Sequence, residues 1–177
     1  SNEYDDSDWL PAVVPGTVLY SYMAAGAVPD PGIADNNLQI SESFFNSDFW
    51  YRWTPDTQSL SQSKLAESES LILAFDGINW KAEVYVNGKY VGNIAGAFKR
   101  ARFDITDLIK GDNDVIAVHI IKPAHYAAVK EKNAESPDFN GGQLGADNPT
   151  FHATVGWDWM PIVRGRDMGI WNDVRIE

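Results

Sequence analysis

The chain has 177 residues, enough for one domain with a substantial core, and 44% of them are apolar while 22% are charged. Its 14 basic and 25 acidic residues give a net charge of -11, and such an acidic surface repels phosphate backbones, which argues against nucleic-acid binding. No apolar run reaches the ~18 residues of a membrane span, and the absence of cysteine excludes disulfides and thiolate metal sites.

The first predicted element is a short helix that follows Val14-Pro15-Gly16-Thr17. Thr17 is a residue type that caps helix N-termini, and Gly26 is typical of a helix C-terminus. Between them, Val18, Tyr22 and Ala25 fall on one helical face. The next stretch, residues 29–37, is rich in Pro, Gly, Asp and Asn and therefore predicts a loop.

From Phe49 onward the pattern becomes that of β-strands. Residues 49–53 are rich in aromatic side chains, and residues 71–75 form a short apolar run, so both predict strands. Residues 57–70 between them are mostly polar and predict a loop.

The strongest local signal is the pair Asn87-Gly88. It lies between residues 82–86 and 89–92, two runs in which apolar residues alternate with polar ones. Both residue types tolerate a positive φ, as the two central positions of a type I′ turn require. The pattern therefore predicts a β-hairpin.

Further strands are predicted towards the C-terminus. Residues 101–105 form one, and residues 115–121 are apolar enough to predict a strand buried on both faces, with a short turn at residues 106–114 between them. Residues 122–154 are irregular, and loops of that length tend to be functional. Residues 172–177 predict a last strand. Short strands at such spacing predict one all-β domain over residues 1–177, a sandwich or jelly roll with one short N-terminal helix.

Most familiar catalytic patterns are missing from the sequence. His119, His125 and His152 are not spaced as metal ligands, which argues against a histidine metal site. No nucleophile elbow, phosphate-binding loop or dinucleotide-binding glycine pattern is found. Carboxylates are plentiful, but the sequence alone does not show whether two of them form a glycosidase pair.

Residues 156–174 contain three Trp, three Asp and two Arg. Asp158 lies between Trp157 and Trp159, where burial is costly unless the carboxylate is paired or hydrogen-bonded. Such a segment suits a sugar, because the carboxylate accepts hydroxyl hydrogen bonds while an indole stacks on the apolar face of the ring. The alternative is a core segment in which Asp158 pairs with Arg164 or Arg166. The residues by themselves leave both interpretations open.

Together, several segments resemble the N-terminal sugar-binding domain of family 2 glycoside hydrolases, in particular the branch with exo-β-glucosaminidases and β-mannosidases. They cover nearly the whole chain and are Trp9, Val14-Pro15-Gly16-Thr17, residues 25–31, Asp35-Asn36, residues 49–53, residues 75–79, residues 84–88, residues 156–159, Gly169-Ile170-Trp171 and Asp173-Val174.

This resemblance implies a jelly roll of the galactose-binding-like kind. In the family, an immunoglobulin-like domain and a (β/α)8 barrel follow it, and two Glu residues of the barrel carry out a retaining hydrolysis of O-glycosyl bonds. It also implies that Asp158 and Trp157 contact substrate, with Trp159 and Asn79 as further candidates. No catalytic residue is expected in these 177 residues. No cofactor is expected either, apart from a monovalent cation near Asp158 in the galactosidase branch.

Three functions remain open at this stage. The first is a non-catalytic domain of a larger bacterial glycosidase that works in the periplasm or outside the cell, with the carbohydrate and the downstream domains as its partners. The second is a self-standing carbohydrate-binding module, and the third is a structural domain without sugar contact. One departure from the family is that only eight residues precede Trp9, where the family has a first strand. We therefore expect an unpaired sheet edge, which favours association with another copy.

Overall fold

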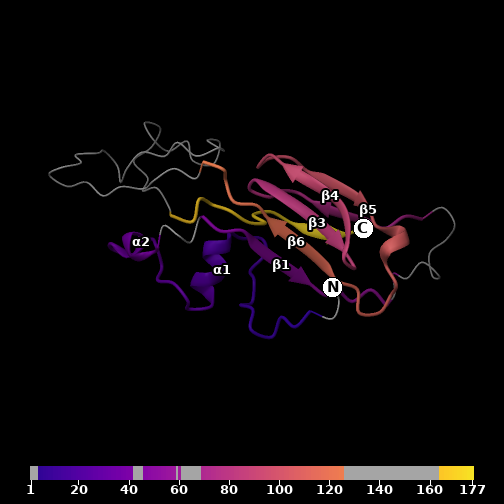
Figure 1. Ribbon diagram of the computed structural model, residues 1–177, viewed down its shortest axis with the longest axis horizontal. Coiled ribbons are helices and arrows are strands. Elements are labelled where there is room, and N and C mark those ends of the chain that lie inside the picture. Colours follow the sequence, from indigo (N-terminus) through magenta and orange to yellow (C-terminus); the bar gives the residue numbers. More distant parts are fainter. Residues whose placement is uncertain (1–3, 42–45, 59, 61–68, 126–163) are drawn as a thin grey trace.

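The computed structural model describes residues 4–41, 46–58, 60, 69–125 and 164–177 (Figure 1). Its helices and strands are α1 (Val18–Ala24), α2 (Asn36–Gln39), β1 (Phe49–Trp53), β2 (Ile72–Phe75), β3 (Lys81–Val86), β4 (Lys89–Ala95), β5 (Ala101–Asp104), the 3-10 helix η3 (Thr106–Leu108), β6 (Ile116–Ile120) and β7 (Val174–Ile176). No helix in this part of the chain is long and apolar enough to cross a membrane.

The strands form two antiparallel sheets. One has the order β1-β6-β3-β4 and the other the order β5-β2-β7. Side chains of both sheets belong to one hydrophobic core, among them Val84 and Ile120 from the first sheet and Leu73 and Phe75 from the second. The predicted all-β sandwich is confirmed.

The hairpin at Asn87-Gly88 is confirmed. Asn87 has a φ of 50° and Gly88 a φ of 78°, so both central positions are left-handed as a type I′ turn requires. The side chain of Asp114, which is fully buried, supports this turn from the neighbouring loop. It accepts hydrogen bonds from the Asn87 amide (2.6 Å), the Thr57 hydroxyl (2.5 Å) and the Gly111 backbone (2.8 Å).

The predicted helix is confirmed as α1. The Thr17 side chain accepts a hydrogen bond from the Tyr20 backbone (3.0 Å), and Gly26 follows the helix with a φ of 73°. The predicted helical face is partly wrong, because Ala25 lies exposed at the C-cap while Ser21 is buried instead. The sequence prediction also missed α2, a four-residue helix at the end of the predicted loop.

The predicted strand at residues 115–121 forms β6, but it is not buried on both faces. Ile116, Val118 and Ile120 are buried, whereas Ala117 and His119 between them are only half-buried. The reason is that these two residues lie on the outer face of the four-stranded sheet, where small or polar side chains are tolerated.

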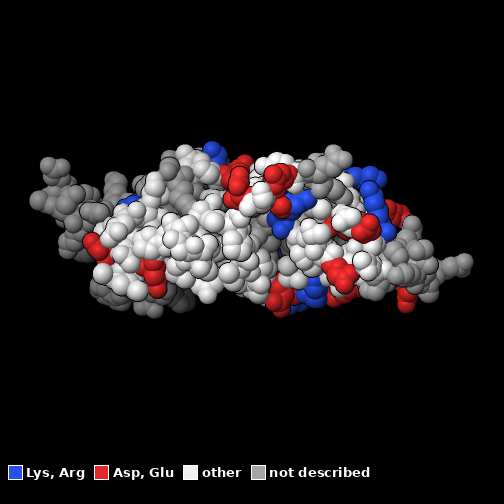
Figure 2. Space-filling view, turned by 90° about the horizontal axis from the view of Figure 1, so that it is seen from below, with Lys and Arg blue, Asp and Glu red and all other residues white. Residues whose placement is uncertain are grey.

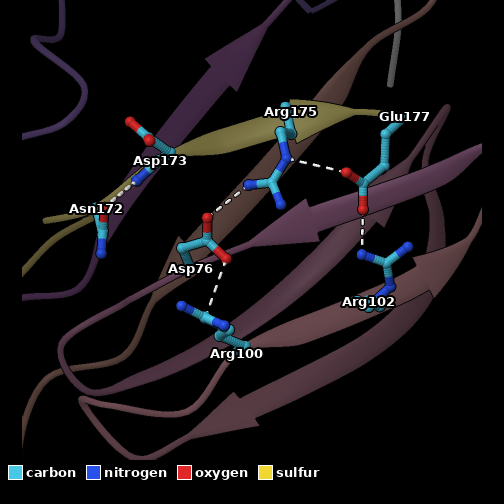
Figure 3. Close-up of polar contacts among 7 residues, drawn as sticks. All are labelled: Asp76, Arg100, Arg102, Asn172, Asp173, Arg175 and Glu177. Atoms are coloured by element: carbon cyan, nitrogen blue, oxygen red, sulfur yellow. Dashed lines mark hydrogen bonds and ion pairs between the residues drawn. The ribbon is translucent and has the colours of Figure 1, made fainter.

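On the second sheet, ion pairs join the three strands across the outer face (Figure 3). Arg175 of β7 pairs with Asp76 (2.5 Å) just after β2 and with Glu177 (3.0 Å). Asp76 also pairs with Arg100 (3.4 Å), and Glu177 with Arg102 of β5. Ion pairs thus hold residues 172–177 against the sheet in addition to the backbone hydrogen bonds of β7.

Candidate functional site

Three of the four predicted sugar-contacting residues, Trp157, Asp158 and Trp159, lie outside the described residues, so their role stays a prediction. The same holds for a cation near Asp158. Asn79 is described, and so is the chain from Arg164 onward. The candidate site is therefore built from Asn79 and from residues 164–171, which continue the predicted segment towards the C-terminus.

Asn79 lies between β2 and β3 and its side chain is buried, with 1% of its surface exposed. Its backbone forms an antiparallel bridge with Gly169, with N–H to O distances of 2.9 and 3.0 Å. Its side-chain amide donates to the carbonyl oxygens of Arg166 (3.1 Å) and Asp167 (3.0 Å). Asn79 thus holds residues 166–169 in place. Its predicted contact with substrate stays a prediction.

Residues 164–171 take an unusual backbone path. Arg166, Asp167 and Gly169 have φ values of 50°, 51° and 134°. Residues other than Gly, Asn and Asp adopt a positive φ only at a cost, so the backbone at Arg166 needs support from its surroundings. The two hydrogen bonds from the Asn79 amide provide part of that support.

The start of helix α1 gives further support to the turn in residues 164–171. The Gly16 backbone N–H donates to the Ile170 carbonyl (2.9 Å), and the Val18 N–H donates to the Met168 carbonyl (2.7 Å). Both N–H groups belong to the first turn of the helix or precede it, where no partner exists within the helix. The segment and the helix therefore complete each other's hydrogen bonds.

Arg164 connects the segment to α2. Its backbone N–H donates to the Asn37 side chain (3.1 Å), and its guanidinium donates to the Ile40 carbonyl (2.7 Å). The neighbouring Arg166 side chain is fully buried and donates to the Arg164 carbonyl (2.9 Å). These contacts thus fix the point at which the described chain resumes, Arg164. The pairing of Asp158 with either arginine, the alternative left open by the sequence, stays untested because Asp158 is not described.

The acidity of the Asp167 side chain in this segment is strongly altered. Burial raises the pKa of Asp167 to about 6, because the charged form loses water contacts. A carboxyl with such a pKa can hold or release a proton near neutral pH, as functional carboxyls often do. Asp167 could not be singled out from the sequence, since its position within residues 156–174 gives no sign of its burial.

A metal site is not indicated in the part of the chain that the structure describes, where no group of three or more His, Asp or Glu side chains could hold an ion. His119 instead lies between two carboxylates, with Nε2 2.9 Å from Asp48 and Nδ1 3.5 Å from Glu83.

The chain has clear relatives. The family described as glycosyl hydrolase 2 galactose-binding domain-like matches residues 1–172. Among curated proteins, a mannosylglycoprotein endo-beta-mannosidase of Lilium longiflorum is 34% identical over 95% of this chain and 17% of its own. An exo-beta-D-glucosaminidase of Streptomyces avermitilis is 28% identical over 98% of this chain and 16% of its own.

A solved structure of a similarly named enzyme has the same fold. The beta-D-mannosidase from Dictyoglomus thermophilum shares the fold with a TM-score of 0.67 and 26% identity, over 98% of this chain and 21% of the larger one. The chain thus spans about a fifth or less of the length of the proteins it matches.

Proposed function

Because this chain belongs to the family of glycosyl hydrolase 2 galactose-binding domain-like domains, we propose that it is the non-catalytic N-terminal sugar-binding domain of a larger exo-β-glycosidase. The observation that carries the proposal is the family match over residues 1–172. Relatives named as a mannosidase and a glucosaminidase support a β-glycoside as the substrate of the parent enzyme.

In this proposal, the 177 residues form a single domain of the parent and the chemistry belongs to its other domains, an immunoglobulin-like domain and a barrel. The short share of each relative that the chain spans supports that division. A retaining hydrolysis needs two carboxyl groups about 5–5.5 Å apart, and we place both in the barrel.

The proposed contribution of this chain is substrate contact through Asp158, with Trp157 and Trp159 beside it. Support comes from the residues that follow. The contacts of Arg164 with α2 and those of Asn79 with residues 166–169 fix the chain from Arg164 onward. Because Arg164 is only six residues after Asp158 in the sequence, the length of the chain limits how far Asp158 can lie from this fixed point.

The proposal is tested by Asp158→Ala in the full-length parent. A hydrogen bond from a substrate hydroxyl to a carboxylate is worth about 1.5–3 kcal/mol, so kcat/KM on aryl β-glycosides should fall roughly ten- to hundredfold. Thermal unfolding should stay unchanged. The control is Asp112→Ala, which removes the same charge from an exposed position in the turn before β6. Wild-type activity of the Asp158 variant on every β-glycoside tested would refute this role.

The alternative is a self-standing carbohydrate-binding module. Calorimetry of the 177-residue chain with mannose and glucosamine distinguishes the two. A domain that supplies only one side of a shared pocket should bind a free monosaccharide with a Kd in the millimolar range or weaker, whereas micromolar binding would favour the module.

A further inference from the structure

The outer face of the four-stranded sheet carries a row of stacked side chains. Trp50 of β1 lies opposite His119 of β6, which lies opposite Glu83 of β3. The indole is parallel to the imidazole, with 4.4 Å between ring centroids and 8° between planes. Trp50 is nevertheless 46% exposed, so a large apolar surface is left open to solvent beside the imidazole.

The next row along the sheet contains a gap. Here Arg52 of β1 lies opposite Ala117 of β6, and Ala117 lies opposite Tyr85 of β3. Because the alanine methyl is much shorter than its neighbours, it forms the floor of a cavity of about 340 Å³. This cavity, here called the aromatic groove, is lined among others by Tyr4, Trp9, Trp50, Arg52, Tyr85 and Ala117.

The N-terminal segment forms the other wall of the aromatic groove. Tyr4 and Trp9 contact each other edge to face at 5.7 Å, and both are exposed. An ion pair between Asp6 and Arg52 (2.5 Å) holds this segment against β1. The ring of Trp50 also lies 5.7 Å from that of Tyr85, so aromatic rings line more than one side.

Hydrogen-bonding groups lie beside these rings. The Tyr85 hydroxyl donates to Glu83 (2.7 Å), and the Asp48 carboxylate lies 2.9 Å from His119 Nε2. Each of these carboxylates has further lone pairs that can accept from a ligand hydroxyl. The groove itself is lined by apolar ring faces, and the acceptors of Glu83 and Asp48 lie outside its lining, on the same face of the sheet.

We propose that the aromatic groove binds an oligosaccharide of neutral pyranose units, as a second sugar site built from residues outside the predicted segment 156–159. Pyranose rings present apolar C–H faces that suit exposed indoles, and hydroxyl edges that suit carboxylates and phenols. The cavity volume falls within the range of about 300–1,000 Å³ found for small-molecule sites. The nearby carboxylates of Asp6, Asp48 and Glu83 oppose a phosphorylated or acidic ligand.

The test is a titration of the ¹⁵N-labelled chain with β-1,4-linked mannotetraose and cellotetraose, followed through the indole N–H signals. We expect the signals of Trp9 and Trp50 to shift, with a Kd on the order of millimolar for at least one sugar. Trp50→Ala should weaken binding about tenfold, since it removes the more exposed of the two indoles that line the groove. Ala117→Leu, which fills the floor and leaves every ring in place, should weaken binding as well.

The matched control is Trp53→Ala. Trp53 lies on the same strand and is 40% exposed, but it lines a different cavity, so its loss should leave binding unchanged. The spectrum of each variant without sugar reports whether it folds. No shift with either sugar at about 20 mM, or equal weakening by Trp53→Ala, would overturn the proposal. Binding that survives Trp50→Ala and disappears with Asp158→Ala would overturn it too, and would instead support the proposed function.

Discussion

Asn79 and Asp167 lie close together, but the polar groups of their side chains are satisfied to different degrees. The Asn79 amide is buried but donates to two carbonyl oxygens, so its burial costs little. Burial raises the pKa of the nearby Asp167 carboxyl to about 6, because the charged form is disfavoured there. A carboxyl whose pKa is shifted this far by its surroundings is a candidate for a functional role.

We expect Asp167→Asn to stabilise the fold at pH 7. The pKa of Asp167 is raised on folding, so the native chain loses stability as the pH rises through about 6, where this carboxyl becomes charged. The neutral amide avoids that cost, and asparagine tolerates the left-handed backbone at this position. The free energy of unfolding in urea at pH 7 should rise by about 1–3 kcal/mol.

The same comparison at lower pH provides the control. At about pH 3 or below, the carboxyl is mostly protonated in both the folded and the unfolded chain, so the two proteins should be nearly equally stable there. A difference of equal size at both pH values would show that the charge of Asp167 is not its cause.

Among the elements, the contact between α1 and residues 164–171 depends on Gly169. This glycine has a φ of 134°, and a Cβ atom on it would lie 2.8 Å from Tyr51 Oη and 2.9 Å from the Val18 nitrogen. The backbone of the segment can approach the helix start only because no side chain intervenes.

We therefore expect Gly169→Ala to destabilise the domain by about 2–4 kcal/mol, since it adds a steric clash to an unfavourable φ. The matched control is Gly88→Ala in the hairpin turn, where φ is 78° but no atom lies within 4 Å of the added Cβ. That variant should lose only about 1–2 kcal/mol, the conformational cost alone. Urea unfolding curves of both variants measure the difference, and equal losses would mean that the contact with α1 is unimportant.

The elements also show how much of the fold could be predicted from the sequence. The hairpin at Asn87-Gly88 and the cap at Thr17 were predicted because their signals are local, within a few residues. The role of Asn79 was not, since its partners lie near residue 166, far along the chain. The half-exposed face of β6 was missed for a similar reason. An apolar run does not show which side of a sheet faces solvent, and so the groove over Ala117 could not be foreseen.

For the whole molecule, the dominant electrostatic property is the excess of acidic residues. The net charge is -11, and acidic and basic side chains are mixed over the face shown in Figure 2. The ion pairs on the three-stranded sheet act at contact distance, such as the 2.5 Å between Arg175 and Asp76 (Figure 3). Repulsion among the excess carboxylates acts over longer distances. These two contributions respond differently to salt.

We expect NaCl to raise the melting temperature at pH 7. Between about 10 mM and 500 mM salt, the screening length falls from about 30 Å to a few ångströms, which removes long-range repulsion but weakens contact pairs less. Exposed ion pairs also contribute only about 0–1 kcal/mol each. A gain of about 1 kcal/mol corresponds to roughly 2–4 °C in a domain of this size, which calorimetry resolves.

Near pH 4.6, the isoelectric point, the gain should vanish, because no excess charge remains to be screened. A melting temperature that falls with NaCl at pH 7 would show instead that the ion pairs outweigh the net repulsion.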